Sequence, residues 1–455
     1  MASVRPAAVA GAFYPGNPGA LAAEVEDLLG GVERFEPRFS HPKVLVVPHA
    51  GYIYSGPVAA AAYDELVAAR GVVRRVVLLG PVHRVPVSGL ALPGADAFAT
   101  PLGTIPVDAA AVTSLAGLHQ VVTSAPAHQL EHSLEVQLPF LQRMLGEFAL
   151  VPLAVGRASA VEVAEAIERL WGGPETLVVI STDLSHDHRY DEAQRIDGAT
   201  LARIAALATD LRHEEACGAT PLNGMLEVAR RRGLAIRQLA ACNSGDTAGG
   251  KDRVVGYSAF ALDEGPPVAR EDAGRALVAI ARGAIGHQLG EGPAPATSGA
   301  PWLARAGATF VTLMLEGKLR GCIGSLAAQR PLGIDVAENA LGAAFRDPRF
   351  APLSAAEWPR CALEVALLSA AKPLRFADEH DLYAQIRAGE DGLILEHEGR
   401  RATYLPQVWE GLPEKRRFLE ELKKKAGIAP ETRLARCKLW RYRVAKWRHS
   451  DSAVH

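Results

Sequence analysis

The sequence predicts an α/β protein, in which a mainly parallel sheet flanked by helices is followed by a smaller α+β domain. Residues 1–263 alternate short apolar runs with Ala- and Leu-rich helical stretches, as in βαβ units. With 455 residues, the chain is long for one domain of roughly 100 to 200 residues. Paired prolines and charges interrupt the pattern at 264–271, so we expect a linker between domains 1–263 and 272–455.

The elements of the first domain follow one another in a regular order. Its predicted strands are apolar, often β-branched runs that are too short for helices. They cover residues 44–47, 76–79, 150–153, 177–180, 236–239 and 254–262. The predicted helices cover residues 57–69, 160–171, 192–207 and 222–232. Strands that are apolar throughout are typical of a sheet covered on both faces.

The second domain shows a less regular order. Strands are predicted at 308–315, 362–368, 392–397 and 440–445, and helices at 273–289, 333–345, 382–388 and 415–426. Gly427 is placed to end the last helix from the C′ position. The alternation around Trp440 to Trp447 predicts an edge strand.

Composition limits the class of protein. A hydrophobic share of 49%, a charged share of 22% and a net charge of −2 are typical of ordinary globular chains. The apolar runs are far shorter than the roughly 20 residues that span a bilayer, and the N-terminus lacks a signal-peptide pattern. We therefore expect a cytoplasmic protein without membrane contact. The five cysteines form no CxxC pair, so we expect reduced thiols.

Polar side chains follow three predicted strands of the first domain. His49 comes just after 44–47, His83 just after 76–79, and Asp183 and His186 just after 177–180. Ligands bind at the carboxyl ends of strands in open parallel sheets. Two histidines and a carboxylate are the ligand set of oxygen-activating Fe(II) sites. The alternative is that each histidine caps a loop by hydrogen bonding.

A further cluster lies in AHQLEHSLEVQLPFL. Its members are His128, Glu131, His132 and Glu135. The spacing places Glu131 with Glu135, or His128 with His132, on one face of a helix. They are either metal ligands, groups that support the ligands, or the polar face of a helix whose other side is buried.

The first domain resembles the Memo family. The motifs that carry the resemblance are AGAFYPG, PHAGYIYSG, LGPVHRVPVSG, EHSLEVQLPFL, STDLSHDH and NSGD with VVGYSAFAL. The family is similar to class III extradiol ring-cleaving dioxygenases, which implies a sheet flanked by helices with a metal at the strand ends. The resemblance implies that His49 and His83 bind this metal, and that Asp183 and His186 belong to the site. We expect His186 to act as acid/base, held by Asp183.

One ligand position departs from the family. Animal Memo proteins use a cysteine as third ligand, but the matching residue here is Thr247. Asp246 and Cys242 are the neighbouring candidates, and we favour Asp246 because a carboxylate completes an oxygen-activating set. The expected cofactor is Fe(II), with copper and zinc as alternatives.

The second domain offers a candidate nucleophile. In KLRGCIGSL, Cys322 lies between glycines and near Arg320, a setting that can stabilise a thiolate. The alternative is a small buried residue in a turn. This half resembles the AMMECR family through LRGCIG, FRDPRF, LEVALLS and DGLILEHEGRRATYLPQVW. That resemblance makes Arg320, Cys322, Arg346, Asp347 and Glu364 candidate site residues, with Glu364 expected to be buried beside Arg320 or to act as a base.

The two resemblances together suggest a bifunctional chain. Bacterial members resemble proteins B and A of the AmmeMemoRadiSam system, whose third component is a radical S-adenosylmethionine enzyme and thus a candidate partner. We expect iron-dependent oxidative chemistry on a small aromatic substrate, next to a reactive Cys322. The alternative is a metal-binding protein fused to a ligand- or nucleic-acid-binding module. The basic stretch 423–448 is explained by a solvated face over buried aromatics, so nucleic acid is not the expected partner.

Overall fold

The computed structural model describes residues 3–32, 39–265 and 268–449 and divides the chain into two compact units. The first unit contains the described residues up to Val32 and from His41 to residue 265. The second unit contains residues 39–40 and the described residues from Val268 onwards. Pro266 and Pro267 of the expected linker lie outside the described residues. In the described part of the chain, no helix has the length and hydrophobicity needed to cross a membrane.

A nine-stranded sheet forms the centre of the first unit. Its middle strands are parallel neighbours, as predicted, in the order β2 (Val44–Val47), β9 (Thr176–Ser181), β3 (Arg75–Pro81) and β8 (Ala149–Val155). The outer strands add antiparallel pairs on both sides. They are β10 (His186–His188), β11 (Ala235–Asn243), β12 (Val254–Asp263), β4 (Leu90–Leu92) and β7 (Val121–Thr123). The carboxyl ends of β2, β9 and β3 therefore lie next to one another.

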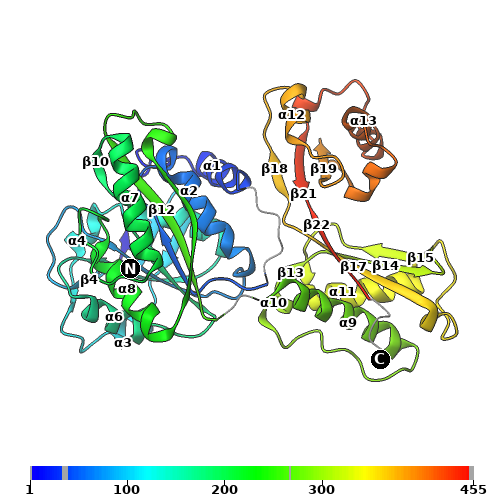
Figure 1. The fold of residues 1–455 in the computed structure, drawn as a ribbon, viewed down its shortest axis with the longest axis horizontal. Helices are drawn as coiled ribbons and strands as arrows, with labels where there is room; N and C mark the ends of the chain where they lie inside the picture. Colours follow the sequence, from blue (N-terminus) through cyan, green and yellow to red (C-terminus); the bar gives the residue numbers. More distant parts are fainter. Residues whose placement is uncertain (1–2, 33–38, 266–267, 450–455) are drawn as a thin grey trace. The chain divides into compact units, whose positions relative to one another are not determined.

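Both faces of this sheet are buried. In β2, Leu45 and Val47 belong to one apolar core, whereas Val44 and Val46 belong to the other. The first core includes α1 (Pro18–Gly30), α2 (Tyr52–Tyr63) and α5 (Leu138–Leu145), and the second includes α3 (Ala109–Ser114), α6 (Ala160–Arg169) and α8 (Ala219–Arg232) (Figure 1). Alternate side chains of one strand thus enter opposite cores, which explains the uninterrupted apolar runs.

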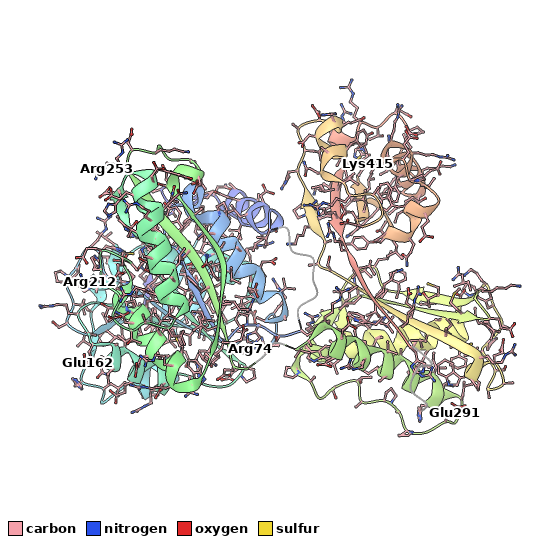
Figure 2. All side chains as sticks on the ribbon, viewed as in Figure 1. Arg74, Glu162, Arg212, Arg253, Glu291 and Lys415 are labelled. Carbon is pink, nitrogen blue, oxygen red and sulfur yellow. The ribbon has the colours of Figure 1, made fainter. Side chains whose placement is uncertain are left out.

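The remaining elements of the first unit are short or lie at its borders. They are β1 (Val4–Arg5), β5 (Ala97–Thr100) and β6 (Gly103–Pro106) of a three-stranded sheet, η1 (Asp64–Ala68), α4 (Ala125–Gln129), η2 (Glu135–Gln137), α7 (Tyr190–Ala205) and η3 (Ser244–Asp246). Charged side chains such as Arg212 and Arg253 project from the surface of this unit (Figure 2).

Helix α2 begins earlier than predicted. The predicted helix starts at Pro57, a residue type that is favoured in the first turn of a helix. The structure starts the helix at Tyr52 with Gly51 as N-cap and holds Pro57 inside it. The helix therefore begins only three residues after His49, which places its first turn beside the ends of the central strands.

The second unit contains two four-stranded antiparallel sheets. The first has the order β15 (Lys318–Gly324), β14 (Thr309–Leu315), β17 (Cys361–Leu368) and β22 (Val444–Arg448), and shares a core with α9 (Arg270–Gln288) and α11 (Leu332–Leu341). The second has the order β18 (Lys372–Leu374), β21 (Lys438–Tyr442), β19 (Gly392–His397) and β20 (Arg400–Tyr404), and shares a core with α12 (Glu379–Gln385) and α13 (Lys415–Lys425).

The predicted strand at 440–445 is divided between β21 and β22, because the chain changes sheets at Arg443. The Arg443 N–H donates to Ser369 Oγ and its carbonyl accepts from Ser369 N–H, so neither continues a strand ladder. β21 lies between β18 and β19 and is not an edge strand, whereas β22 lies at the edge of its sheet, as the alternation predicts. Gly427 directly follows Ala426, the C-cap of α13, and has a φ of 68°, which confirms its C′ role.

Candidate metal centre

Three histidines meet at the carboxyl ends of the central strands. His49 and His83 each lie two residues after a strand, β2 and β3 respectively, and His132 lies in the loop between α4 and η2. One ring nitrogen from each lies within 4.8 Å of the others. The ring centroids are 5.2 Å apart for His49 and His83, and 4.7 Å apart for His83 and His132. The group could hold a metal ion.

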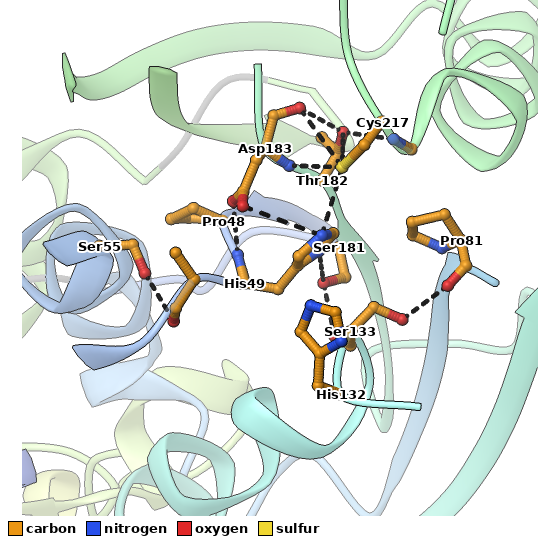
Figure 3. A network of polar contacts seen from close by, with 12 residues as sticks. Pro48, His49, Ser55, Pro81, His132, Ser133, Ser181, Thr182, Asp183 and Cys217 are labelled. Carbon is orange, nitrogen blue, oxygen red and sulfur yellow. Dashed lines mark hydrogen bonds and ion pairs between the residues drawn. The ribbon is translucent and has the colours of Figure 1, made fainter. Parts of the chain in front are cut away.

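The hydrogen bonds of Ser181 fix the tautomer of His49 (Figure 3). The Ser181 hydroxyl donates its single proton to the Ser133 carbonyl at 2.6 Å and accepts from the Gln137 amide at 2.9 Å. His49 Nδ1, 2.9 Å from the same oxygen, must therefore carry a proton and donate it. Nε2 of His49 keeps its lone pair, as a metal ligand requires.

Glu131 fixes His83 in the same way. Its Oε1 is 2.9 Å from His83 Nδ1, and its Oε2 accepts the His83 backbone N–H at 2.7 Å. Burial raises the pKa of Glu131, but the hydrogen bonds from His83 and Ser133 outweigh it and lower the pKa to about 2. Because an ionised carboxylate only accepts, Nδ1 of His83 is protonated, and Nε2 is the nitrogen left for a metal.

The third histidine contains an unpartnered polar atom. His132 Nδ1 is buried without a hydrogen-bond partner and lies 3.3 Å from Glu131 Oε1. Burial lowers the pKa of His132 to about 4. Burial, with the charges of His83, His132 and His186, also holds the pKa of His49 well below its usual range. Both rings are therefore neutral at pH 7, the form in which imidazole binds metals, so this donor set fits a transition-metal ion.

Asp183 and His186 lie beside this group. Asp183 is buried, and its Oδ1 accepts the His49 backbone N–H at 2.7 Å. Burial raises the pKa of Asp183 to about 6, although that hydrogen bond and the charge of His186 act in the opposite direction. His186 Nδ1 lies 2.9 Å from the Leu184 carbonyl, which only accepts. Leu184, and not Asp183 as predicted, thus sets the tautomer of His186 and leaves its Nε2 free to take a proton.

The structure places Asp246 and Cys242 outside the three-histidine group within the described residues. The Asp246 carboxylate accepts a hydrogen bond from the Tyr190 hydroxyl and another from the Asn243 backbone N–H, and so closes the turn after β11. Burial raises the pKa of Cys242 to about 11. Where the sequence predicted a carboxylate from this loop, the structure places the His132 imidazole.

The cluster around Glu131 does not form the predicted helix. Residues 130–134 lie between α4 and η2, so its members point in different directions. Glu135 forms a buried ion pair with Arg5 and accepts the Tyr14 hydroxyl at 2.5 Å, which fixes the N-terminal segment. His128 Nε2 lies 2.7 Å from the Ala91 carbonyl. Glu131 and His132 belong to the candidate metal centre, whereas His128 and Glu135 support the fold.

Cys217 is a buried residue beside the centre that the sequence did not single out. Its Sγ lies 3.2 Å from His49 Nε2 and accepts the Asp183 backbone N–H at 3.3 Å (Figure 3). Burial and the charge of Asp183 raise the pKa of Cys217 to about 12, so the thiol is protonated without a metal. Because His49 Nε2 has a lone pair, the thiol donates to it. Cys217 and His49 are 168 positions apart in the sequence, so no local pattern predicts their contact.

In the second unit, Cys322 is held by its backbone. Its N–H donates to Asp347 Oδ2 at 2.9 Å, and its carbonyl accepts from Arg349 at 3.1 Å. The Arg349 guanidinium beside it, with the Cys322 N–H, holds the pKa of Asp347 well below its usual range, against the effect of burial. The Thr312 hydroxyl donates to Cys322 Sγ at 3.3 Å. The partly exposed thiol thus sits in a rigid setting with one donor aimed at sulfur.

The other candidates of the second unit have different partners from those expected. Arg320 binds the Glu357 carboxylate at 3.0 and 3.2 Å rather than Cys322 or Glu364. Glu364 is only partly buried and pairs with Lys446 and Arg448. Arg346 pairs with Glu338. Arg320 is the extra residue of a β-bulge between β14 and β15, which turns its side chain away from Cys322.

Comparisons with known proteins agree with a division into two parts. The family model of Memo-like proteins matches residues 5–261, and that of AMMECR1 matches residues 278–447. Two relatives are described as MEMO1 family proteins. The one from Sulfolobus acidocaldarius is 35% identical to this chain, and the one from Methanopyrus kandleri is 36% identical to it. These alignments cover 56% and 57% of this chain and 97% and 99% of the relatives. An uncharacterised protein of known structure from Pyrococcus horikoshii is 30% identical over 39% of this chain and 91% of its own, with a TM-score of 0.35.

Proposed function

Because the chain belongs to the Memo-like protein family and carries an AMMECR1 domain after it, we propose that its first unit is a metal-dependent oxidoreductase and that its second unit carries a reactive cysteine. The observation that carries the first part is the tautomer shared by His49 and His83. Nδ1 of each ring is engaged in a hydrogen bond, which leaves Nε2 for a metal beside His132. A centre of neutral imidazoles suits iron, copper or zinc.

The expected metal is Fe(II), which when bound supplies the one-electron chemistry that dioxygen needs. The residues of the chain supply the rest. His49, His83 and His132 would hold the ion, and Glu131 orients His83 through its second nitrogen. His186, with Nδ1 committed to Leu184, has Nε2 free to remove a proton from a substrate hydroxyl.

We propose a small aromatic substrate for this centre. The Phe13 ring lies 4.8 Å from the His132 ring, centroid to centroid, at an interplanar angle of 44°. Both side chains are only partly buried. The Phe13 ring offers an apolar face beside the proposed metal ligands, against which an aromatic ring can pack.

Oxygen uptake tests this function. Protein loaded anaerobically with Fe(II) is mixed with catechol-like compounds, and oxygen consumption is followed with an electrode. The wild-type chain should consume oxygen, His186→Ala should keep its iron but lose turnover, and His49→Ala with His83→Ala should lose both. Iron bound without uptake for any compound would favour the alternative, a metal-binding protein without catalysis.

For the second unit, the supporting observation is the hydrogen bond from Thr312 to Cys322 Sγ, since a donor to sulfur stabilises the thiolate. The side chains of the basic stretch 423–448 give little support to nucleic-acid binding. Tyr442 and Trp447 are buried, and Lys423 donates to the Pro430 and Thr432 carbonyls. Joining the two units in one chain raises their effective concentration for successive steps, and a radical S-adenosylmethionine enzyme is the partner we propose for them.

A further inference from the structure

A hollow of about 770 Å³ lies between α1 and α2, which are neighbouring helices of the first unit (Figure 1). Gly56 lets the two helices approach closely, because a Cβ at this position would lie 2.8 Å from Leu28 Cδ1. Leu28 also lines the hollow. The small residues of the lining, which leave this space unfilled, are Ala20, Ala23, Gly31, Pro57 and Ala61. The volume is within the range of roughly 300 to 1,000 Å³ that is typical of small-molecule sites.

The lining is apolar except for two carboxylates of α1. Glu24 is partly buried, and Asp27, one turn further along the helix, is exposed. Glu24 forms no ion pair with any residue that the structure describes. Burial, together with the charge of Asp27, raises the pKa of Glu24. Burial and, to a smaller extent, neighbouring charges that include Glu24 raise the pKa of Tyr52, so the Glu24 carboxylate lies on the side of α1 that faces α2.

A carboxylate in this setting favours a cation as its partner. Removing an ionised group from water is costly unless an opposite charge or a hydrogen bond replaces the water. The apolar walls of the hollow cannot do this, whereas an ammonium group can, and its charge also reduces the repulsion between Glu24 and Asp27. The walls themselves are stabilised when an apolar group covers them.

We propose that the hollow between α1 and α2 is a binding site for an organic cation, a molecule that joins an ammonium group to an apolar body. The ammonium group binds Glu24 and Asp27, and the apolar body packs against Leu28, Pro57 and Ala61. These residues differ from the three histidines of the candidate metal centre, so the inference stands without a bound metal and goes beyond the proposed function.

Isothermal titration calorimetry of the metal-free full-length chain tests this site. The probes are phenylbutylamine, which is a cation at pH 7, and its uncharged counterpart phenylbutanol. Wild type should bind the amine at one site and the alcohol about 10-fold more weakly, as expected for one hydrogen bond to a charged group. Glu24→Gln should lose this preference for the amine. Glu26→Gln should keep it, because Glu26 is on the same helix but pairs with Arg143 outside the hollow.

A second variant locates the bound probe. Ala23→Leu keeps a good helix former and fills the hollow with a longer side chain. It should weaken binding of both probes by more than about 10-fold, as expected when well over 1.4 kcal/mol of contact is lost. Circular dichroism checks that each variant retains its helices, and Ala23→Leu decides the question if Glu24→Gln does not fold.

Several results would overturn the inference. They are absence of binding by wild type at millimolar amine, equal affinities for amine and alcohol, and an equal loss in Glu24→Gln and Glu26→Gln. Binding that persists in Ala23→Leu would place the probe elsewhere. If wild type sediments as a dimer that Ala23→Leu converts to a monomer, a second copy of the chain covers the hollow instead of a small cation.

Discussion

Glu131 accepts hydrogen bonds from both the ring and the backbone of His83, at 2.9 and 2.7 Å. This pair holds a candidate metal ligand in a single orientation, with its Nδ1 protonated. It also explains why the carboxylate is buried: its oxygens receive further N–H groups from His132 and Ser133.

We therefore expect Glu131→Gln to weaken metal binding by about 10- to 100-fold, the usual effect of losing a partner behind a ligand. Competition with a chelator of known affinity measures the change. Glu227→Gln is the control, because Glu227 pairs with Arg231 on the surface of α8. Equal affinities of wild type and Glu131→Gln would show that Glu131 does not support a ligand.

The same residue predicts a dependence of stability on pH. The pKa of Glu131 is about 2 in the folded protein, below the usual value of about 4.3. Its stabilisation is therefore fully present above pH 5 and is lost as the pH falls towards 2, by roughly 3 kcal/mol. Urea unfolding of metal-free protein should show the difference between wild type and Glu131→Gln shrinking over this range.

Asp183 should give the opposite trend. Its pKa is raised to about 6, so the folded state holds the proton more tightly than the unfolded state does. The resulting stabilisation is fully present below pH 4 and is lost as the pH rises through 6, by roughly 3 kcal/mol. Asp183→Asn keeps an acceptor for the His49 N–H, and its stability relative to wild type should rise between pH 4 and 7.

Urea unfolding of the metal-free proteins at several pH values measures this difference. Asp187→Asn, at an exposed position with a φ of 66° that asparagine tolerates, is the control and should follow wild type throughout. A flat difference for Asp183→Asn would mean that Asp183 is ionised in the folded protein across this range.

The third histidine can be tested against the predicted carboxylate. We expect His132→Ala to lose metal and Asp246→Asn to retain it, because only His132 lies with His49 and His83 among the described residues. Elemental analysis after dialysis gives the metal content. If Asp246→Asn loses metal while His132→Ala retains it, the third ligand comes from the turn after β11.

The sequence predicts the strand ends better than the loops between elements. The strands at 44–47, 76–79 and 177–180 are apolar throughout because both faces are buried, and this pattern correctly locates His49 and His83. The sequence leaves the role of His132 open between ligand, supporting group and helix surface, because helical spacing does not describe a segment that forms a loop. Cys217 could not be predicted at all, since its contact with His49 depends on a glycine that lets two distant loops meet.

The sequence predicts that Arg320 lies beside Cys322, because the two residues are close in a glycine-rich stretch. In a regular strand they would also share one face. A single extra residue in β15 breaks that alternation, so Arg320 pairs with Glu357 and the cation that reaches Cys322 is Arg349. A bulge of this kind depends on pairing with β14 and leaves no clear mark in the local sequence.

Alkylation of the full-length native chain tests Cys322 directly. We expect brief treatment with iodoacetamide to label Cys322 before Cys361 and Cys437, which are buried and whose pKa values burial raises. Thr312→Val should slow labelling of Cys322 several-fold at pH 8, because the thiolate loses the hydroxyl that donates to it. Peptide mapping by mass spectrometry gives the order and the rates.

Two further variants make this last prediction specific. Thr104→Val removes an exposed hydroxyl from the first unit and should leave the rate at Cys322 unchanged. Arg320→Lys should also leave it unchanged, because the Arg320 guanidinium is bound by Glu357. If Arg320→Lys slows labelling as much as Thr312→Val does, Arg320 activates the thiol after all. Labelling of Cys322 that is no faster than that of the buried cysteines would instead make it a structural residue of β15 and leave the second unit as a binding module.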